Sequence, residues 1–182
     1  PKISRGFALC VGAAVVASAL LGYPRLSQSL WEDEEYSVRR CIVGGHRVDG
    51  DGQVRPKHFP WRNTLWNYSS TTNHVLQSVL ARLSHSSWRW FAQPGGLRLS
   101  ETAIRLPSYL AGILIVPLLA LLMARFGFPW EGAFAAWLVA LHPWHLRFAT
   151  EARGYGLVAL FILLGCLFAV AALNTGKWRW WI

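Results

Sequence analysis

Long apolar stretches alternate with polar segments along this chain, and the alternation predicts a bundle of membrane-spanning helices. Four stretches carry almost no charge over about the length that crosses the hydrocarbon core of a bilayer. They are residues 6–23, 106–123, 132–148 and 154–173. The third is continuously apolar only to Leu141 and reaches spanning length by continuing through His142 and Pro143. The pattern indicates an all-α, multi-pass integral membrane protein.

The first apolar stretch has two interpretations. Residues 6–23 follow Lys2 and Arg5, as a retained spanning helix would, but Ala17-Ser18-Ala19 resembles the small-residue site of a cleaved signal peptide. The spans that follow favour the retained helix. In both cases the positive flank places the amino terminus in the cytoplasm and the next segment outside.

Residues 24–105 form an outer loop that is too long to be a simple connection between two spans. Asp49-Gly50 and Asp51-Gly52 predict turns within it. Further on, five apolar residues recur on one face at helical spacing, namely Val75, Leu76, Val79, Leu80 and Leu83. This stripe predicts an amphipathic helix lying on the membrane surface, or a helix packed on a small core of the loop itself. The pattern alone favours neither.

Composition and charge support the membrane class and narrow the partners. The chain is 53% hydrophobic and only 15% charged, with a formal net charge of +9. Its Lys and Arg residues are scattered among apolar stretches and form no basic stripe with a nucleic-acid-binding motif. We therefore expect membrane lipid or a phosphorylated ligand as partner, and no nucleic acid.

Four consecutive carboxylates at residues 32–35 follow the first span. They fit a solvated acidic turn at the membrane edge, and they also fit a proton-accepting site. If the four spans alternate, residues 145–155 emerge on the same outer face, carrying Arg147 and Arg153. A planar guanidinium suits a phosphate, so carboxylates and phosphate-binding cations would meet there.

Four short motifs, in order along the chain, resemble those of the GT-C membrane glycosyltransferases. They are Trp31-x-Asp33-Glu34-x-Tyr36-Ser37, Asn73-His74-Val75-Leu76, Glu101-x-x-x-Arg105-Leu106-Pro107-Ser108 and Glu151-Ala152-Arg153-Gly154-Tyr155. The chain is most similar to bacterial relatives of the dolichyl-phosphate-mannose protein mannosyltransferases and to aminoarabinose transferases. The resemblance covers nearly the whole chain apart from an insert at residues 44–70.

The resemblance implies a GT-C-like fold, of which residues 1–182 would be the amino-terminal part. It implies an enzyme of the bacterial plasma membrane that transfers a sugar from a polyprenyl-phosphate donor, with inversion, on the extracytoplasmic side. The family's acidic motif falls on Asp33 and Glu34, and its donor-phosphate arginine falls on Arg153. The acceptor is unknown.

The hypothesis that follows makes Asp33 the general base and Glu34 a residue that orients the nucleophile or its neighbours. Arg153 would bind the donor phosphate. Further candidates for substrate binding are Arg147, Arg105, Glu151, Tyr155 and His74. Glu151 fits equally well as an ion-pair partner of Arg147 or Arg153, and His74 fits an ordinary interfacial histidine. No cofactor is predicted, although the carboxylates are chemically compatible with a divalent metal.

An alternative from another class is a non-catalytic lipid-binding or transport protein whose acidic cluster binds a cation or a proton. The centres of the four predicted spans carry no ionisable residue, which a conducting path would usually require. This absence favours the enzyme.

Overall fold

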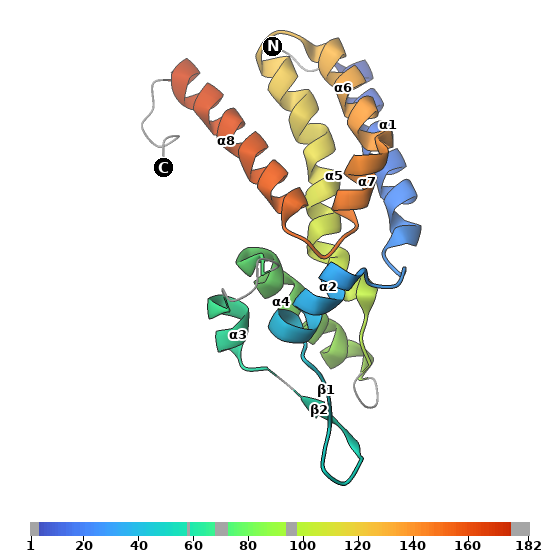
Figure 1. The fold of residues 1–182 in the computed structure, drawn as a ribbon. Coiled ribbons are helices and arrows are strands. Elements are labelled where there is room, and N and C mark those ends of the chain that lie inside the picture. The colour runs from blue at the N-terminus through green and yellow to red at the C-terminus, as the bar shows by residue number, and fades with distance from the viewer. Residues whose placement is uncertain (1–3, 58, 68–72, 94–97, 176–182) are drawn as a thin grey trace. The chain divides into compact units, whose positions relative to one another are not determined.

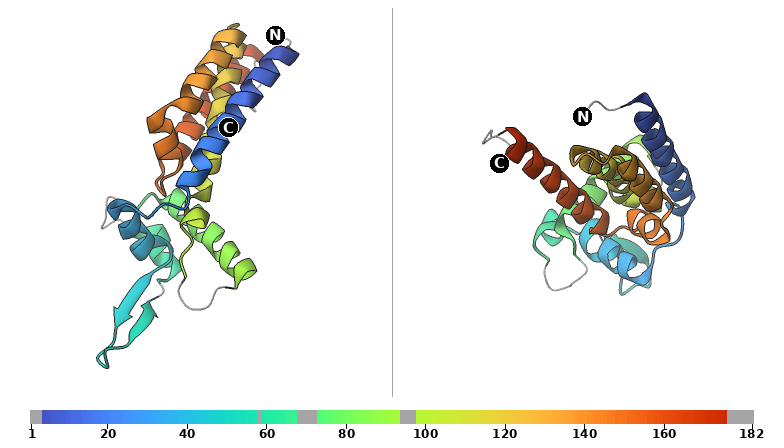
Figure 2. Two further views of the ribbon diagram at one scale, coloured as in Figure 1. Left: turned by 90° about the vertical axis from the view of Figure 1, so that its right-hand side faces the viewer. Right: turned by 90° about the horizontal axis from the view of Figure 1, so that it is seen from above.

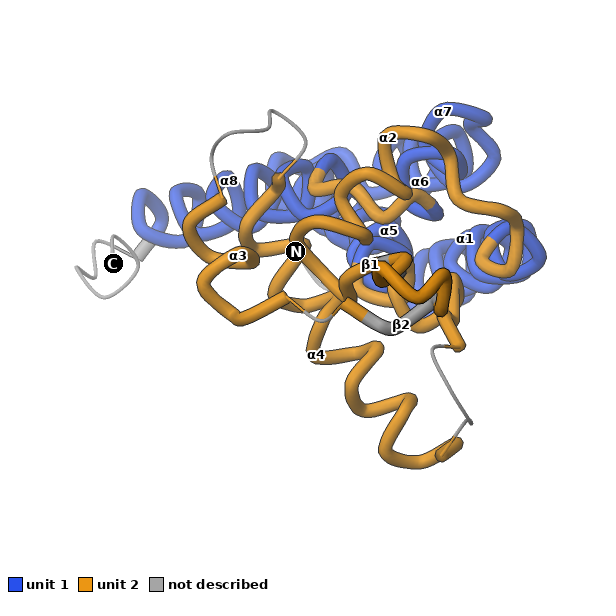
Figure 3. Tube along the Cα trace, turned by 60° about the horizontal axis from the view of Figure 1, so that its bottom comes forward, with its two compact units in different colours: residues 1–25, 108–150, 155–182 blue, residues 26–107, 151–154 orange. Residues whose placement is uncertain are grey.

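A computed structural model describes residues 4–57, 59–67, 73–93 and 98–175 of the chain. The chain divides into two compact units (Figure 3). Unit 1 comprises residues 1–25, 108–150 and 155–182, and unit 2 comprises residues 26–107 and 151–154. The apolar stretches lie mostly in unit 1, and the predicted outer loop forms most of unit 2.

Unit 1 is a helical bundle. Its elements are α1 (Arg5–Gly22) with the 3-10 turn η1 (Tyr23–Arg25), α5 (Glu101–Arg125) from Ser108 onward, α6 (Pro129–Leu141), α7 (Pro143–Ala149) and α8 (Tyr155–Thr175). Figures 1 and 2 show α1, α5 and α6 side by side, and their facing residues form one buried apolar cluster. Among the described residues, three segments are long and apolar enough to cross a membrane: Arg5–Arg25, Glu101–Arg125 and Tyr155–Asn174. They overlap three of the four predicted spans.

Small residues allow these helices to approach closely. Ala14 on α1, Ala120 on α5 and Ala136 on α6 are all fully buried in the shared cluster. At Gly132 a Cβ atom would lie 2.7 Å from the carbonyl oxygen of Ala120, so only glycine fits there. Packing of small residues is the usual basis of helix association in lipid.

The third predicted span, 132–148, is not one continuous helix. α6 ends at Leu141 and α7 begins at Pro143, while His142 between them has extended backbone angles (φ −70°, ψ 123°). Proline has no N–H for the helical ladder, and it disfavours helical angles in the residue before it. Helix α6 therefore ends at Leu141, because Pro143 prevents its continuation through His142.

Unit 2 contains short elements and one amphipathic helix. They are α2 (Glu32–Ser37), the π-helical turn η2 (Val38–Ile42), strands β1 (Gly45–Val48) and β2 (Val54–Lys57), α3 (Trp61–Trp66) and α4 (Val75–Ala92), together with the first residues of α5. The buried apolar cluster is made of Val38, Cys41, Ile42, Ala81, Ile104 and Ala152. Residues 151–154 thus belong to this unit through Ala152.

The strands form an antiparallel hairpin, a small departure from the all-α expectation (Figure 1). Val48 pairs with Val54, and the N–H of Asp49 donates to the carbonyl of Gln53 over 2.9 Å. Gly52 has a φ of +77°, a conformation that glycine adopts without strain. The predicted turns at Asp49-Gly50 and Asp51-Gly52 are confirmed as the two halves of this hairpin loop.

Helix α4 extends nine residues beyond the predicted stripe and buries its more polar face. Gln77, Ser78, Ala81 and His85 are buried. Leu76 and Leu83 remain 48% exposed, and Trp90, two turns further along the same face, is 71% exposed. The stripe is therefore divided: Leu76 and Leu83 are not packed against a core of unit 2, whereas Val75, Val79 and Leu80 are half-buried.

Candidate functional site

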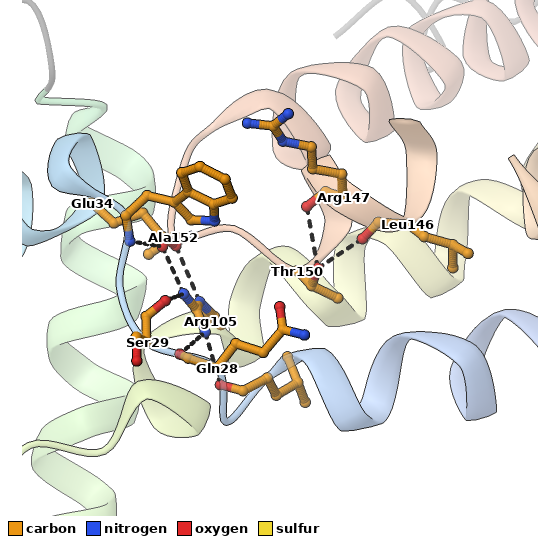
Figure 4. A network of polar contacts seen from close by, with 10 residues as sticks. Gln28, Ser29, Glu34, Arg105, Leu146, Arg147, Thr150 and Ala152 are labelled. Atoms are coloured by element: carbon orange, nitrogen blue, oxygen red, sulfur yellow. Dashed lines mark hydrogen bonds and ion pairs between the residues drawn. The ribbon is translucent and has the colours of Figure 1, made fainter. Parts of the chain in front are cut away.

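A buried ion pair between Glu34 and Arg105 lies within unit 2 (Figure 4). Glu34 is 0% exposed and Arg105 is 1% exposed. The Nε of Arg105 donates to Oε1 of Glu34 over 3.1 Å, and its Nη2 donates to Oε2 over 2.6 Å. Two such parallel bonds form the bidentate arrangement in which a guanidinium holds a carboxylate with defined geometry.

Backbone carbonyls of the loop after α1 take the remaining donors of Arg105. Nη1 donates to Leu26 and Gln28, and Nη2 donates to Ser29 over 3.1 Å (Figure 4). An arginine side chain has five N–H donors, and here all five are used. Arg105 could therefore bind a substrate phosphate only by giving up bonds to the protein.

The carboxylate of Glu34 is equally satisfied. Oε2 accepts from the N–H of Trp31 over 3.0 Å, and Oε1 accepts a short hydrogen bond from the N–H of Ala152. Burial raises the pKa of Glu34, but the bonds from Arg105, Ala152 and Trp31 outweigh it and hold the pKa below its ordinary value. The group is thus an ionised carboxylate that ties α2 to α5 and to residues 151–154.

Asp33 is adjacent to Glu34 but faces solvent. Its side chain is 60% exposed, and its Oδ2 lies 3.3 Å from Nη2 of Arg153. The Arg153 side chain is 25% exposed and follows Ala152 directly. The bond from Ala152 to Glu34 therefore positions Arg153 beside Asp33, so the buried pair supports the exposed one.

His74 packs against the same segment. A Cβ on Gly154 would lie 3.0 Å from Cβ and 3.2 Å from Nδ1 of His74, so the close contact depends on glycine. Burial, and then the positive charge of Arg153, lower the pKa of His74. The imidazole is therefore neutral near pH 7 and can donate or accept a hydrogen bond.

The other candidates from the sequence are divided between the two units. Arg147 and Tyr155 belong to unit 1, where the Arg147 guanidinium lies over the ring of Trp144 and Tyr155 packs edge-on against Phe148. Glu151 belongs to unit 2 and is 5% exposed. In the described part of the chain, no group of three His, Cys, Asp or Glu side chains gathers as metal ligands would.

Sequence reasoning missed the backbone part of this arrangement. The carbonyls of residues 26, 28 and 29 and the amide of Ala152 complete the Glu34–Arg105 pair, and backbone groups carry no signal of their own in a sequence. Gly154 was a detectable signal, because a glycine directly after a candidate arginine suggests a close approach.

Three apolar helices of spanning length define an integral membrane protein, and unit 2 supplies a charged, partly exposed site. The chain belongs to the dolichyl-phosphate-mannose-protein mannosyltransferase family, whose family model matches residues 89–182, just over half of the chain. The match includes Arg105, Arg153 and the segment around them. Asp33, Glu34 and His74 precede it.

No curated protein and no solved structure matched the chain. Family membership supports the recognised GT-C-like relationship and the general class of activity, which is glycosyl transfer from a polyprenyl-phosphate-linked sugar by a membrane protein.

Proposed function

We propose that this protein transfers a sugar from a polyprenyl-phosphate donor to an acceptor on the extracytoplasmic face of a bacterial plasma membrane, with inversion at the anomeric carbon. The observation that carries the proposal is the partly exposed Asp33–Arg153 pair, held in place by the buried Glu34–Arg105 pair. A candidate base and a candidate phosphate-binding cation are thereby brought together from opposite parts of the chain.

Asp33 would act as the general base. Its carboxylate takes a proton from the acceptor hydroxyl or amine as that group attacks the anomeric carbon. The bond between that carbon and the phosphate oxygen breaks, and its electron pair leaves on the polyprenyl phosphate. A single displacement of this kind inverts the anomeric configuration.

Arg153 would stabilise the departing phosphate. Negative charge grows on that group during the reaction, and a fixed guanidinium meets it best where water is partly excluded. Arg153 is three-quarters buried, whereas its partner carboxylate is mostly exposed. The buried pair gives Glu34 and Arg105 positioning roles, and the neutral His74 is available to the sugar hydroxyls.

The Asp33–Arg153 contact must open during this reaction, because in a displacement the attacking and leaving groups lie on opposite sides of the anomeric carbon. The Asp33 carboxylate is 60% exposed and water partly screens its contact with Arg153, so a bound phosphate can replace Asp33 on Arg153. Donor binding would then release the carboxylate for its role as base.

The decisive experiment incubates membranes containing the protein with a panel of radiolabelled polyprenyl-phosphate sugars and follows the label. Transfer to an acceptor fraction with one donor, and its loss in Asp33→Asn, is the expected result. Label that stays on every donor, together with donor-independent cation or proton binding by the acidic residues, would favour the non-catalytic alternative.

A further inference from the structure

A basic cavity of about 510 Å³ lies within unit 2, formed by η2, the end of β2 and α3. Its lining residues are Arg40, Lys57, Phe59, Arg62, Asn63, Trp66 and Asn67. Three are cations and none is acidic. The volume falls within the range of small-molecule sites, about 300–1,000 Å³.

Two of the three cations of this cavity, Arg40 and Lys57, contact aromatic rings, and no carboxylate of the described residues pairs with any of the three. Arg40 lies 4.2 Å from the ring centre of Tyr36, and the Lys57 ammonium lies 5.2 Å from that of Phe59. By contrast, Arg105 and Arg153 of the same unit each pair with an acidic residue. The cavity therefore concentrates positive charge that an anionic ligand can neutralise.

Aromatic and amide groups line the same cavity. Trp66 is 68% exposed, and Phe59 is half-buried. A flat aromatic face suits the apolar face of a sugar ring, and the amide of Asn63 can bond to hydroxyl groups. Cations beside aromatic and amide groups fit a ligand that is both a saccharide and an acid.

Buried and partly buried hydrogen bonds hold the wall of the cavity in place. Thr64 on α3 donates to the carbonyl of Cys41 over 2.6 Å. Arg82 on α4 donates to the Thr64 hydroxyl over 2.7 Å and to the carbonyl of Phe59 over 2.8 Å. These bonds fix α3 against η2, so the lining side chains project from an ordered frame.

Apart from Arg40, the lining residues lie on the insert at residues 44–70 that the family resemblance does not cover, and all of them lie outside the segment that the family model matches. The cavity is nevertheless joined to the candidate site. Arg40 follows Asp33 by seven residues on the continuous helical stretch of α2 and η2. At 1.5 Å per residue, this separates their backbones by about 10 Å.

We propose that this cavity binds an acidic saccharide. This saccharide is the part of the acceptor that the insert recognises. As an acceptor site the proposal rests on the proposed glycosyl transfer, but the binding itself can be measured alone. Arg62 and Lys57 would contact the acid group, and Trp66 would stack on the ring.

The test uses the protein in phosphatidylcholine nanodiscs and trigalacturonic acid as the probe, with calorimetry as the readout. The acid should bind at least about tenfold more tightly than its fully methyl-esterified form, because charge-assisted hydrogen bonds are lost on esterification. Arg62→Ala and Lys57→Ala should each weaken binding about tenfold. Arg98→Ala, which removes an exposed cation of unit 2 outside the cavity, should leave binding unchanged.

Three outcomes would overturn the proposal: equal affinity for acid and ester, no binding of either, and the same loss in Arg98→Ala as in Arg62→Ala. If inorganic phosphate competed as well as the saccharide, the cavity would be a general anion site and the saccharide part of the proposal would be wrong. Displacement of the probe by phosphatidylglycerol in the nanodisc would assign the cavity to a lipid headgroup instead. Circular dichroism confirms that the variants are folded.

The label-transfer assay separates this proposal from the proposed function. Binding of the acid without transfer from any donor keeps the cavity and rejects the acceptor role. Transfer that Arg62→Ala leaves unchanged keeps the enzyme and rejects the cavity as its acceptor site.

Discussion

Asp33 and Glu34 are neighbours in the sequence but lie in opposite environments. Consecutive residues of a helix point about 100° apart, so α2 turns Glu34 toward Arg105 and Asp33 toward solvent. The exposed carboxylate can exchange protons with a substrate, whereas the buried one has its acceptor positions occupied by the protein. In the proposed mechanism Asp33 is thus the reacting residue and Glu34 the positioning residue.

Asp33→Asn should reduce turnover by roughly 10²- to 10⁴-fold, since the amide keeps the size of the side chain and removes the basic oxygen. Expression and donor binding should stay near normal, because the Asp33 side chain is 60% exposed. Label transfer in membranes measures turnover, and binding of a labelled donor measures donor affinity. Glu32→Gln is the matched control, and equal effects at both positions would remove Asp33 from the mechanism.

Arg153→Lys should weaken donor binding more than a substitution that keeps charge would suggest. An ammonium cannot reproduce the planar fork that binds phosphate with two bonds. Donor affinity and turnover of the lysine and alanine variants are to be compared in nanodiscs. If Arg153→Ala bound and used the donor as wild type does, Arg153 would be only a partner of Asp33.

Glu34 should make stability depend on pH. Its folded-state pKa lies below the ordinary value of 4.5, so the carboxylate stabilises the fold above that value. This contribution is lost as the pH falls from about 4.5 through the folded-state pKa. Glu34→Gln should cost about 3–5 kcal/mol at neutral pH, because it leaves Arg105 buried without its counter-ion.

Thermal unfolding in detergent micelles, at neutral pH and below pH ~4, measures both effects of Glu34. The control is Glu35→Gln, which breaks an exposed pair with Arg39 and should change stability by about 0–1 kcal/mol. A Glu34→Gln protein that unfolds at the wild-type temperature would contradict the structural role of the pair.

Among the elements, α4 carries a row of exposed apolar side chains. Leu76, Leu83 and Trp90 recur every seven residues and remain exposed. We expect this face to lie in the membrane interface, as exposed apolar side chains on an amphipathic helix do. An environment-sensitive fluorophore on a cysteine at position 83 should shift to the blue in nanodiscs. The same label at Gly50, in the hairpin loop, should not, and identical spectra would place α4 in water.

The predictability of the elements depended on local signals. Charge-free stretches marked α1, α5 and α8, and Asp-Gly pairs marked the hairpin loop, because these signals act within a few residues. The helix break at Pro143 is an equally local signal. The prediction of a single span over 132–148 gave more weight to the length that a membrane crossing requires. The Glu34–Arg105 pair was beyond prediction, since its partners are 71 residues apart and meet only through packing.

At the scale of the whole molecule, the proposed activity requires Asp33 and Arg153 to lie on one side of the membrane. A single cysteine near Asp49 or near Ala149 should react with a membrane-impermeant reagent from outside, and one near Gly127 should not. Labelling is to be done on intact cells in a background without native cysteines. Opposite labelling of positions 49 and 149 would exclude a shared outer face and the proposed site with it.

The bond between Ala152 and Glu34 has a consequence for how the chain is made. The two residues are 118 apart, so the carboxylate leaves the ribosome long before the amide that completes its hydrogen bonds. At about 5–20 residues per second, Glu34 waits roughly 6–24 seconds for Ala152. Throughout that interval the nascent unit 2 keeps an incompletely bonded charge. Its final fold is therefore a late event of biosynthesis, reached only as α8 emerges.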